Sequence, residues 1–212
     1  MAIVGRDETP SHLTDELRKC IRCSFDECSG NDDEFPLTVD VASGFVRAIV
    51  EYGVDLSNEC ILDVGCGKGR FAHVLLHELP GSSIVGIDVS GGMLKYVSEH
   101  IRKCVGSMTA LPFRDQRFDL VYAVESLEHA VEISLAVSEM CRVLRVGGRL
   151  VIIDKNAEQA GRLKTPFWEK WFHREEIERL LSRECSTVSS RFVSYRSGVE
   201  PDGLFIVWMA TK

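Results

Sequence analysis

The sequence predicts an α/β fold in which helices cover both faces of a doubly wound, mostly parallel sheet. Beyond residue 61, apolar strand-like runs alternate strictly with helix-like stretches, and this alternation produces right-handed β-α-β units. The 212 residues, of which 45% are hydrophobic and 27% charged, suffice for one substantial core. No internal repeat or low-complexity segment divides the chain, so we expect residues 1–212 to form a single domain.

Residues 1–36 are expected to cap the domain, to gate a ligand pocket or to be partly disordered. A short helix near residues 13–24 precedes an acidic, turn-rich stretch at residues 26–36. From residue 37 to residue 52, apolar side chains recur at helical spacing, which predicts a helix packed beside the next strand.

Residues 61–72 read as a buried strand that runs through an acidic, glycine-rich turn into a helix. The turn contains Asp63, Gly65, Gly67 and Gly69. Glycine lets a backbone approach a ligand closely, and the N-terminus of the following helix offers unpaired N–H groups and a positive dipole end. These features predict a small-molecule cofactor site.

Asp63 narrows the choice of cofactor. In a dinucleotide site the pyrophosphate occupies the glycine turn, where a carboxylate would repel it. The dinucleotide fingerprint also requires a third glycine where this chain has Arg70. S-adenosylmethionine carries no phosphate, and its ammonium and sulfonium groups attract a carboxylate. The pattern Asp-x-Gly-x-Gly-x-Gly resembles the first motif of the class I S-adenosylmethionine-dependent methyltransferases.

A second predicted strand, residues 83–88, ends in Asp88 about twenty residues beyond the glycine turn, where a carboxylate can accept hydrogen bonds from both ribose hydroxyls. Ser90 is a candidate N-cap for a helix over residues 91–100. The resemblance implies that Met93 packs its long apolar side chain on the adenine.

Residues 105–121 resemble the stretch between the third and fourth strands of small methyltransferases of this class. The family usually has an acid that recognises the adenine amino group where this chain has Ser107. A hydroxyl accepts the same hydrogen bond more weakly, so recognition is expected to rely on backbone groups near Ser107 and Met108. Residues 124–129 match the loop that closes over the methionine part of the cofactor, and Glu125 is expected to contribute backbone contacts there.

Helices are further predicted at residues 70–78 and 131–144, and residues 142–153 match the family's glycine turn and fifth strand, with Val146 where proline is common. The resemblance covers residues 61–154. It implies a Rossmann-like, seven-stranded sheet of order 3-2-1-4-5-7-6 with strand 7 antiparallel. The cofactor-binding residues that it assigns are Asp63, Gly65, Cys66, Gly67, Asp88, Val89, Met93, Ser107, Met108 and Glu125.

After the cofactor half, residues 37–154, the remaining residues 155–212 are expected to form the acceptor side. Residues 168–181 read as one or two helices, and two strands at residues 186–195 and 204–210 are predicted to form an antiparallel hairpin at the sheet edge. Trp168, Trp171 and Phe172 would share one helix face. We expect them to pack on the sheet, with a wall of the acceptor pocket as the alternative.

The sequence identifies no catalytic residue. His129 could be a general base or could have a packing or capping role. Lys155 and Asn156 follow the fifth strand at the carboxyl edge, where open α/β sheets bind ligands, although both residue types are also common in exposed turns. The candidate substrate-binding residues are His129, Lys155, Asn156, Trp168 and Trp171.

The resemblance implies an enzyme that transfers a methyl group from S-adenosylmethionine to nitrogen or oxygen of a small molecule or peptide, releasing S-adenosylhomocysteine. In-line displacement would depend mainly on positioning. Two alternatives stay open. The chain could be a non-catalytic S-adenosylmethionine-binding module, or a nucleotide-dependent oxidoreductase, which would need glycine in place of Arg70.

Composition argues against other classes. The net charge of −7 disfavours nucleic acid, which normally requires a basic face. No apolar run approaches the roughly 20 residues that span a bilayer, and Arg6, Asp7 and Glu8 stand where a secretory signal needs apolar residues. We therefore expect a cytoplasmic monomer or homodimer without a membrane partner. Cys20 and Cys23 have metal-knuckle spacing but no matching second pair, so no metal site is predicted.

Overall fold

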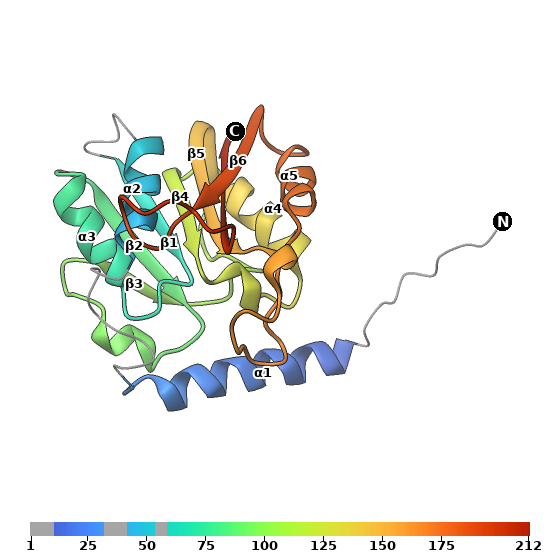
Figure 1. Ribbon diagram of the computed structural model, residues 1–212. Coiled ribbons are helices and arrows are strands. Elements are labelled where there is room, and N and C mark those ends of the chain that lie inside the picture. Colours follow the sequence, from blue (N-terminus) through green and yellow to red (C-terminus); the bar gives the residue numbers. More distant parts are fainter. Residues whose placement is uncertain (1–10, 32–41, 54–58) are drawn as a thin grey trace.

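A computed structural model of the protein describes residues 11–31, 42–53 and 59–212, in which seven strands form one mixed sheet (Figure 1). The order is β3-β2-β1-β4-β5-β7-β6, with β7 antiparallel to both neighbours. This order confirms the implied topology. The strands are β1 (Cys60–Val64), β2 (Ser83–Asp88), β3 (Arg102–Val105), β4 (Phe118–Val124), β5 (Leu144–Lys155), β6 (Thr187–Val193) and β7 (Phe205–Thr211).

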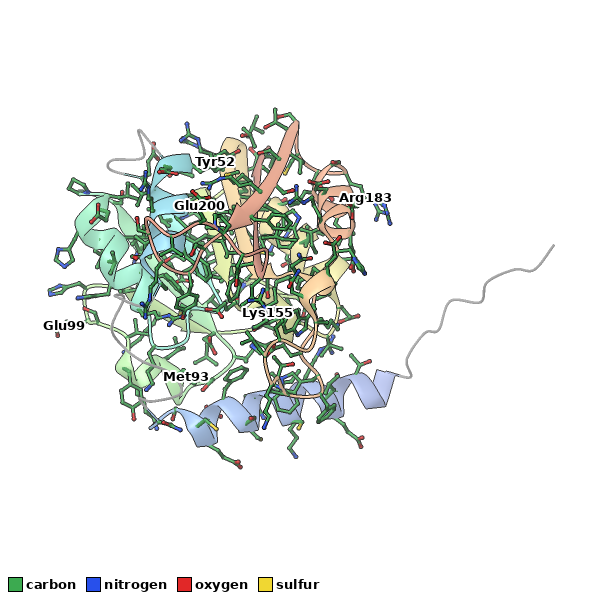
Figure 2. The ribbon with its side chains drawn as sticks, viewed as in Figure 1. Tyr52, Met93, Glu99, Lys155, Arg183 and Glu200 are labelled. Carbon is green, nitrogen blue, oxygen red and sulfur yellow. The ribbon has the colours of Figure 1, made fainter. Side chains whose placement is uncertain are left out.

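Helices cover both faces of the sheet, and side chains fill the space between the layers (Figures 1 and 2). One face packs against α2 (Ser43–Tyr52) and α3 (Arg70–Glu78), the other against α4 (Ile133–Val143) and α5 (Arg174–Leu181). Every residue of β4 is buried, as expected for a central strand with both faces covered. The helix predicted at residues 70–78 is confirmed, because α3 begins and ends at these residues.

Two helix predictions are wrong. Where a helix was expected at residues 91–100, the chain makes a turn with one short 3-10 helix, η1 (Met93–Tyr96). The Ser90 hydroxyl accepts a hydrogen bond from Met93 N (3.0 Å), as a cap would, but Val97 is already extended. The capping signal was correct, and the chain leaves the helix early to begin β3.

The second error concerns residues 168–173, which precede α5 and are not helical. Phe172 N donates to Lys155 O (3.0 Å), and Ala157 N donates to Phe172 O (2.9 Å). Backbone pairing with the end of β5 thus replaces a helical turn. The premise that Trp168, Trp171 and Phe172 share one helix face is wrong for this reason.

The N-terminal helix is longer than predicted: α1 (Ser11–Cys28) lies across one end of the domain, along the bottom of Figure 1. The helix expected over residues 37–52 is described from Ser43 onward, and its beginning lies outside the described residues. The same holds for residues 1–10 and for residues 32–36 of the acidic stretch. None of the described helices combines the length and apolar character needed to cross a bilayer.

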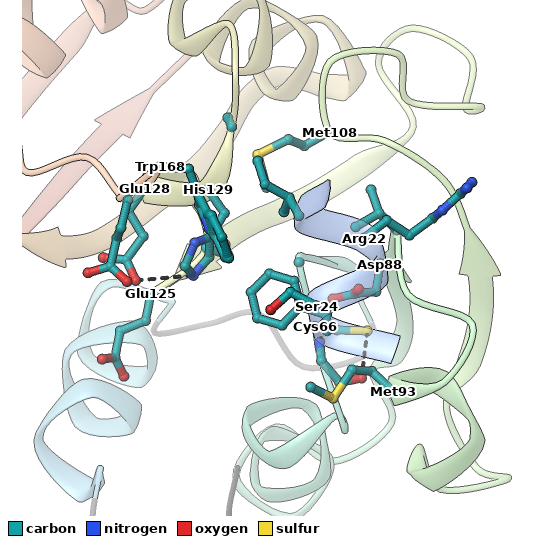
Figure 3. A pocket seen from close by; sticks show the side chains of 18 of the residues that line it. Arg22, Ser24, Cys66, Asp88, Met93, Met108, Glu125, Glu128, His129 and Trp168 are labelled. Atoms are coloured by element: carbon teal, nitrogen blue, oxygen red, sulfur yellow. Dashed lines mark hydrogen bonds and ion pairs between the residues drawn. The ribbon is translucent and has the colours of Figure 1, made fainter. Parts of the chain in front are cut away.

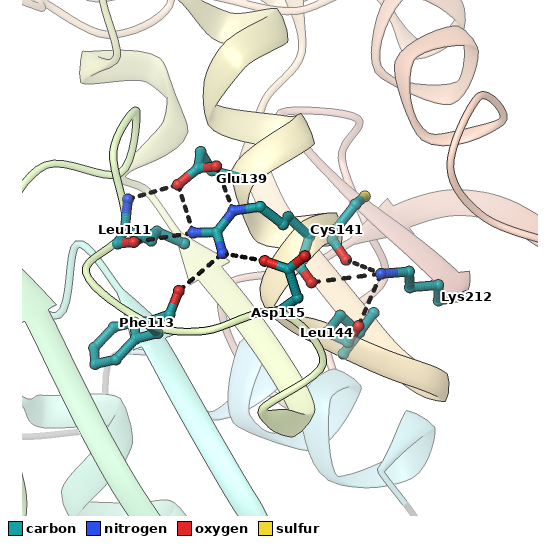
Figure 4. Close-up of polar contacts among 8 residues, drawn as sticks. Leu111, Phe113, Asp115, Glu139, Cys141, Leu144 and Lys212 are labelled. Carbon is teal, nitrogen blue, oxygen red and sulfur yellow. Dashed lines mark hydrogen bonds and ion pairs between the residues drawn. The ribbon is translucent and has the colours of Figure 1, made fainter.

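The loop between β3 and β4 is fixed by one arginine of α4 (Figure 4). Arg142 donates to the backbone oxygens of Leu111 (3.0 Å) and Phe113 (2.8 Å), while Glu139 accepts from Leu111 N (2.7 Å). These contacts hold in place a loop whose first half borders the cavity described below.

Candidate functional site

The carboxyl ends of the parallel strands surround a cavity of about 910 Å³, roofed by α1 (Figure 3). This position is the one at which open α/β sheets bind ligands. Twelve of the site residues predicted from the sequence line it: Gly65, Cys66, Gly67, Asp88, Val89, Met93, Ser107, Met108, Glu125, His129, Lys155 and Trp168. Asp63, Asn156 and Trp171 do not.

The glycine loop after β1 leaves room for a ligand. Gly65, Gly67 and Gly69 have φ of 73°, 53° and 78°, which side chains with a Cβ rarely adopt. A Cβ on Gly65 would lie 2.5 Å from Ser126 Cβ, whereas a Cβ on Gly67 would meet no described atom within 4 Å. Because Gly67 lines the cavity, that open space is space for a ligand.

Asp88 connects this loop to the turn after β2. Its Oδ2 accepts from Gly67 N and its Oδ1 from Ser90 N, each at 2.8 Å. Burial raises the pKa of the carboxyl. Each carboxylate oxygen has a second lone pair, so Asp88 can still accept hydrogen bonds from a ligand's hydroxyls.

Asp63 lies beneath the loop and does not reach the cavity. It is 2% exposed, and burial raises its pKa to about 7, although the nearby Tyr122 hydroxyl opposes the rise. Within the described part of the chain, neither Asp63 Oδ2 nor the Tyr122 hydroxyl has a hydrogen-bond partner of ordinary geometry. Asp63 is only partly ionised near neutral pH, so its effect on a ligand's charge is weaker than its residue type suggests.

An ion pair that the sequence reasoning missed borders the middle of the cavity. Arg70 Nη2 lies 3.0 Å from Glu125 Oε2, and Arg70 Nη1 donates to the Tyr195 hydroxyl (3.3 Å). Glu125 has φ of 48°, an uncommon conformation for a residue other than glycine that tends to cluster at functional sites. Arg70 is the first residue of α3. The only feature of the sequence that pointed to Arg70 as a site residue was its position directly after the glycine motif.

A buried group of charges lies farther along the cavity. Lys155 Nζ is 2.6 and 2.5 Å from the two carboxylate oxygens of Glu128 and 3.1 Å from Glu169 Oε1. Burial raises the pKa of Glu128, and the neighbouring Asp154 raises it further. Burial lowers the pKa of Lys155, but the surrounding carboxylates outweigh this effect and raise it overall. Lys155 therefore remains a cation.

His129 adjoins this group. Its Nε2 lies 3.3 Å from Glu128 Oε1 (Figure 3), and the ring of Phe25 from α1 contacts the imidazole edge-on at 4.9 Å. Burial, with the charge of Lys155, lowers the pKa of His129 to about 3. The imidazole is neutral at physiological pH and, with so low a pKa, is a weak base.

The same residues resemble a metal site. Glu128, His129 and Glu169 offer ligand atoms within 4.8 Å of one another. Both carboxylates, however, already contact the Lys155 ammonium, which supplies the positive charge that a metal ion would bring. We therefore assign no metal to this group.

Helix α1 contacts the turn after β2 directly. Asp26 Oδ1 accepts from the Ser90 hydroxyl (2.7 Å) and from Gly92 N (2.8 Å), and Arg18 forms an ion pair with Glu132. A Cβ on Gly92 would lie 3.0 Å from Asp26 Oδ1, so the helix approaches closely. The sequence marked Asp26 only as part of an acidic stretch.

Asn156 and Trp171 lie outside the cavity lining, and the Ser107 hydroxyl already has a hydrogen-bond partner. Asn156 is buried, with its Nδ2 donating to Gly203 O (2.8 Å) and its Oδ1 accepting from Glu158 N (3.1 Å), which is a structural role. Trp171 lies outside the lining of the cavity. The Ser107 hydroxyl lines the cavity but accepts from Thr109 N (3.2 Å), an arrangement that shapes the local turn.

The chain was compared with known proteins. Residues 62–152 match a family described as a methyltransferase domain. The O-methyltransferase resE of Aspergillus sclerotiorum is 32% identical, over 92% of this chain and 78% of that protein. Demethylmenaquinone methyltransferase of Bacteroides fragilis is 32% identical over 56% of this chain and 52% of that protein. Malonyl-[acyl-carrier protein] O-methyltransferase of Methylococcus capsulatus is 34% identical over 42% of this chain and 35% of that protein. The chain thus spans about a third to a half of the last two relatives.

Solved structures agree in fold. The complex of the Haloferax volcanii Trm112 methyltransferase activator with a methyltransferase gives a TM-score of 0.73 at 14% identity, over 88% of this chain and 96% of the matched chain. An S-adenosylmethionine-dependent methyltransferase of Thermotoga maritima gives 0.68 at 19% identity, over 91% and 99%.

Proposed function

Because the chain belongs to the class I S-adenosylmethionine-dependent methyltransferases, we propose that it methylates a small-molecule or peptide acceptor with S-adenosylmethionine. The observation that carries this proposal is one continuous cavity that extends from Asp88 and Met93 to His129 and Trp168. Its volume of about 910 Å³ is near the top of the range of about 300–1,000 Å³ for ligand pockets. It is large enough for a cofactor and an acceptor together.

The described residues fit S-adenosylmethionine. The open space at Gly67 admits ligand atoms, and the free lone pairs of Asp88 suit ribose hydroxyls. Met93, which is 2% exposed, offers an apolar surface for the adenine. The Arg70 and Glu125 pair presents both signs of charge, matching the carboxylate and the ammonium of a methionine end. The same Arg70 occupies the position at which a dinucleotide-binding loop would need glycine.

The residues of the chain act by binding and by excluding water. S-adenosylmethionine, when bound, supplies a methyl group on a positively charged sulfur, which is already an electrophile. Helix α1 covers the cavity through Asp26 and Phe25, and this cover keeps solvent from the reacting atoms. Holding two reactants in a fixed orientation removes most of the entropic barrier, so positioning is the main contribution we expect.

A transfer assay tests the proposal. The protein is incubated with S-adenosylmethionine labelled in the methyl group and with a panel of hydroxyl, amine and peptide acceptors, and we expect label in at least one acceptor. Binding of S-adenosylhomocysteine without transfer to any of them would favour a non-catalytic module. Failure to bind S-adenosylhomocysteine would contradict the methyltransferase proposal altogether.

A further inference from the structure

Three buried polar atoms in the far half of the cavity have no hydrogen-bond partner in the described structure. They are His129 Nδ1, Trp168 Nε1 and Glu169 Oε1, and all three residues line the cavity. Glu169 Oε1 lies 3.1 Å from Lys155 Nζ but without hydrogen-bond geometry. A buried polar group left unpaired costs about 1–3 kcal/mol, so His129 Nδ1 and Trp168 Nε1, next to a Glu169 oxygen held only by its ion pair with Lys155, indicate a ligand that pairs with this group.

Two segments bring these atoms to one place. His129 ends the short helix η2 (Leu127–His129) after β4, and Trp168 and Glu169 precede α5. Lys170 N donates to Glu128 O (3.0 Å), and Lys170 Nζ donates to the backbone oxygens of residues 130 and 131 at 2.7 Å each. These three bonds join the two segments. A ring nitrogen of His129 and a carboxylate oxygen of Glu169 lie within 4.8 Å of each other, and Trp168 lines the same cavity, so we treat the three groups as one subsite.

The hydrogen-bonding character of the subsite follows from its neighbours. Both oxygens of Glu128 accept from Lys155, so we assign the ring proton of His129 to the Nε2 that lies 3.3 Å from Glu128 Oε1, which leaves Nδ1 as an acceptor. The Trp168 indole N–H can only donate, and the Glu169 carboxylate oxygen can only accept. The subsite therefore offers one donor and two acceptors to its ligand.

A hydroxyl oxygen matches two members of this set, the Trp168 donor and the Glu169 acceptor, and leaves His129 Nδ1 unpaired. It has one proton to donate and two lone pairs, so it can accept from Trp168, donate to Glu169 and keep one lone pair for the methyl carbon. A neutral amine has a single lone pair, which it needs for the attack. The cavity lining includes the apolar side chains of Ile21 and Phe25 from α1 and of Pro166 from the loop before α5, together with charged side chains of the same segments such as Arg22 and Lys164.

We propose that the acceptor is an apolar compound bearing an acidic hydroxyl, of the phenol or enol class, and that Trp168 and Glu169 bind the reacting oxygen. This inference rests on the proposed methyltransferase function. The acceptor oxygen forms the new bond to the methyl carbon, the electron pair of the broken C–S bond stays on sulfur, and the hydroxyl proton passes to Glu169 Oε1. Trp168 is a positioning residue and Glu169 the base.

The strength of the base limits the class of hydroxyl. Burial raises the pKa of Glu169 and the charge of Glu128 adds to the rise, while the Lys155 ammonium opposes it without cancelling it, so this carboxylate is a better base than an exposed one. The pKa of the Glu169 carboxyl still lies far below that of an alkyl alcohol, whereas a phenol has a pKa of about 10. A phenolic or enolic proton is therefore the one that Glu169 can accept.

Binding of matched probes tests the inference without turnover. Protein saturated with S-adenosylhomocysteine is titrated with 2-naphthol and with 2-naphthylamine, which differ only in the reacting group, and binding is followed by calorimetry. We expect 2-naphthol to bind about tenfold more tightly than the amine, the ratio that corresponds to one buried hydrogen bond.

Two conservative variants and one control assign the effect. Trp168→Phe keeps the ring and loses the N–H, and Glu169→Gln keeps the shape and loses the charge. Each is expected to weaken 2-naphthol binding about tenfold and to leave the S-adenosylhomocysteine affinity unchanged. Trp168→Phe should also leave the 2-naphthylamine affinity unchanged, because the amine does not accept a hydrogen bond from Trp168. Trp171→Phe, outside the cavity lining, is the control. Equal binding of the two probes, no binding of 2-naphthol, or variants that bind it like the native protein would overturn the inference. If the native protein did not bind S-adenosylhomocysteine, the proposed function itself would be refuted.

Discussion

Gly67 is a residue at which the backbone leaves open space at the proposed cofactor site. Its φ of 53° and the open space before it mean that a methyl group added there would enter the cavity. Gly147, in the turn inside β5, has φ of 74° and equally open surroundings, but it does not line the cavity. The two glycines therefore share a backbone conformation, and they differ in whether the open space beside them belongs to the cavity.

This difference gives a matched test. Gly67→Ala and Gly147→Ala should each lower the free energy of unfolding by about 1–2 kcal/mol, because alanine is strained in the left-handed region. Only Gly67→Ala should also weaken S-adenosylhomocysteine binding, by about tenfold or more, since a steric overlap of a few kcal/mol has that effect. Urea unfolding and calorimetry measure the two quantities. Equal ligand affinity in both variants would show that the ligand does not approach Gly67.

Asp63 makes the stability of the fold depend on pH. Burial raises its pKa from the ordinary 3.8 to about 7. Between these values the folded protein retains the proton and the unfolded chain releases it, so the contribution of Asp63 to the free energy of unfolding falls as pH rises. From about pH 4 to about pH 8, the native protein should lose up to about 4 kcal/mol relative to Asp63→Asn.

Urea unfolding at several pH values measures this difference. Glu200→Gln, which changes an exposed acid, is the control and should follow the native protein. If Asp63→Asn and the native protein kept a constant difference over the whole range, Asp63 would not hold a proton in the folded state.

At the scale of elements, helix α1 covers the cavity, and Asp26 joins it to the turn after β2. Asp26 accepts two hydrogen bonds from the turn after β2, at 2.7 and 2.8 Å, and these hydrogen bonds lower the pKa of its carboxyl. The Asp26 side chain is exposed to water, so each bond stabilises the closed position only modestly. We therefore expect α1 to move aside for exchange of ligands.

Loss of this contact should accelerate exchange. In Asp26→Asn we expect S-adenosylhomocysteine to dissociate about threefold to tenfold faster, the effect of weakening one or two exposed charged hydrogen bonds. Glu27→Gln, the neighbouring exposed acid on α1, is the matched control. Stopped-flow displacement measures the rate, and equal dissociation rates for the two variants would show that Asp26 does not hold the roof closed.

Elements with a strong local signal could be predicted from the sequence. The strand that ends at Asp88 and the helix α3 have the predicted limits, because a buried apolar run and a glycine turn fix them locally. Predictions failed where distant pairing overrides local pattern. Residues 168–172 have helical spacing, yet Phe172 pairs with the backbone of Lys155, and nothing within the segment signals that partner.

The cofactor side and the acceptor side of the candidate site differ in the same way. The glycine loop and Asp88 lie in contiguous motifs, so the sequence alone marks them. The proposed acceptor subsite joins His129 with Glu169, forty residues later in the chain, and with Phe25, which comes from α1. That residues 155–212 form the acceptor side stays a prediction, and we propose that α1 and η2 contribute to it as well, since both line the same cavity. Only the three-dimensional structure brings these residues together.

For the whole molecule, the central claim is that one cavity at the carboxyl edge of the sheet binds S-adenosylmethionine and its product. Calorimetric titration of the native protein with S-adenosylhomocysteine tests this claim most directly, with NADH as the comparison ligand and Asp88→Asn as the variant. We predict one-to-one binding of S-adenosylhomocysteine, no binding of NADH, and a loss of about 1–3 kcal/mol in Asp88→Asn from the weakened charged hydrogen bonds. Binding of NADH, or no binding of S-adenosylhomocysteine to the native protein, would contradict it.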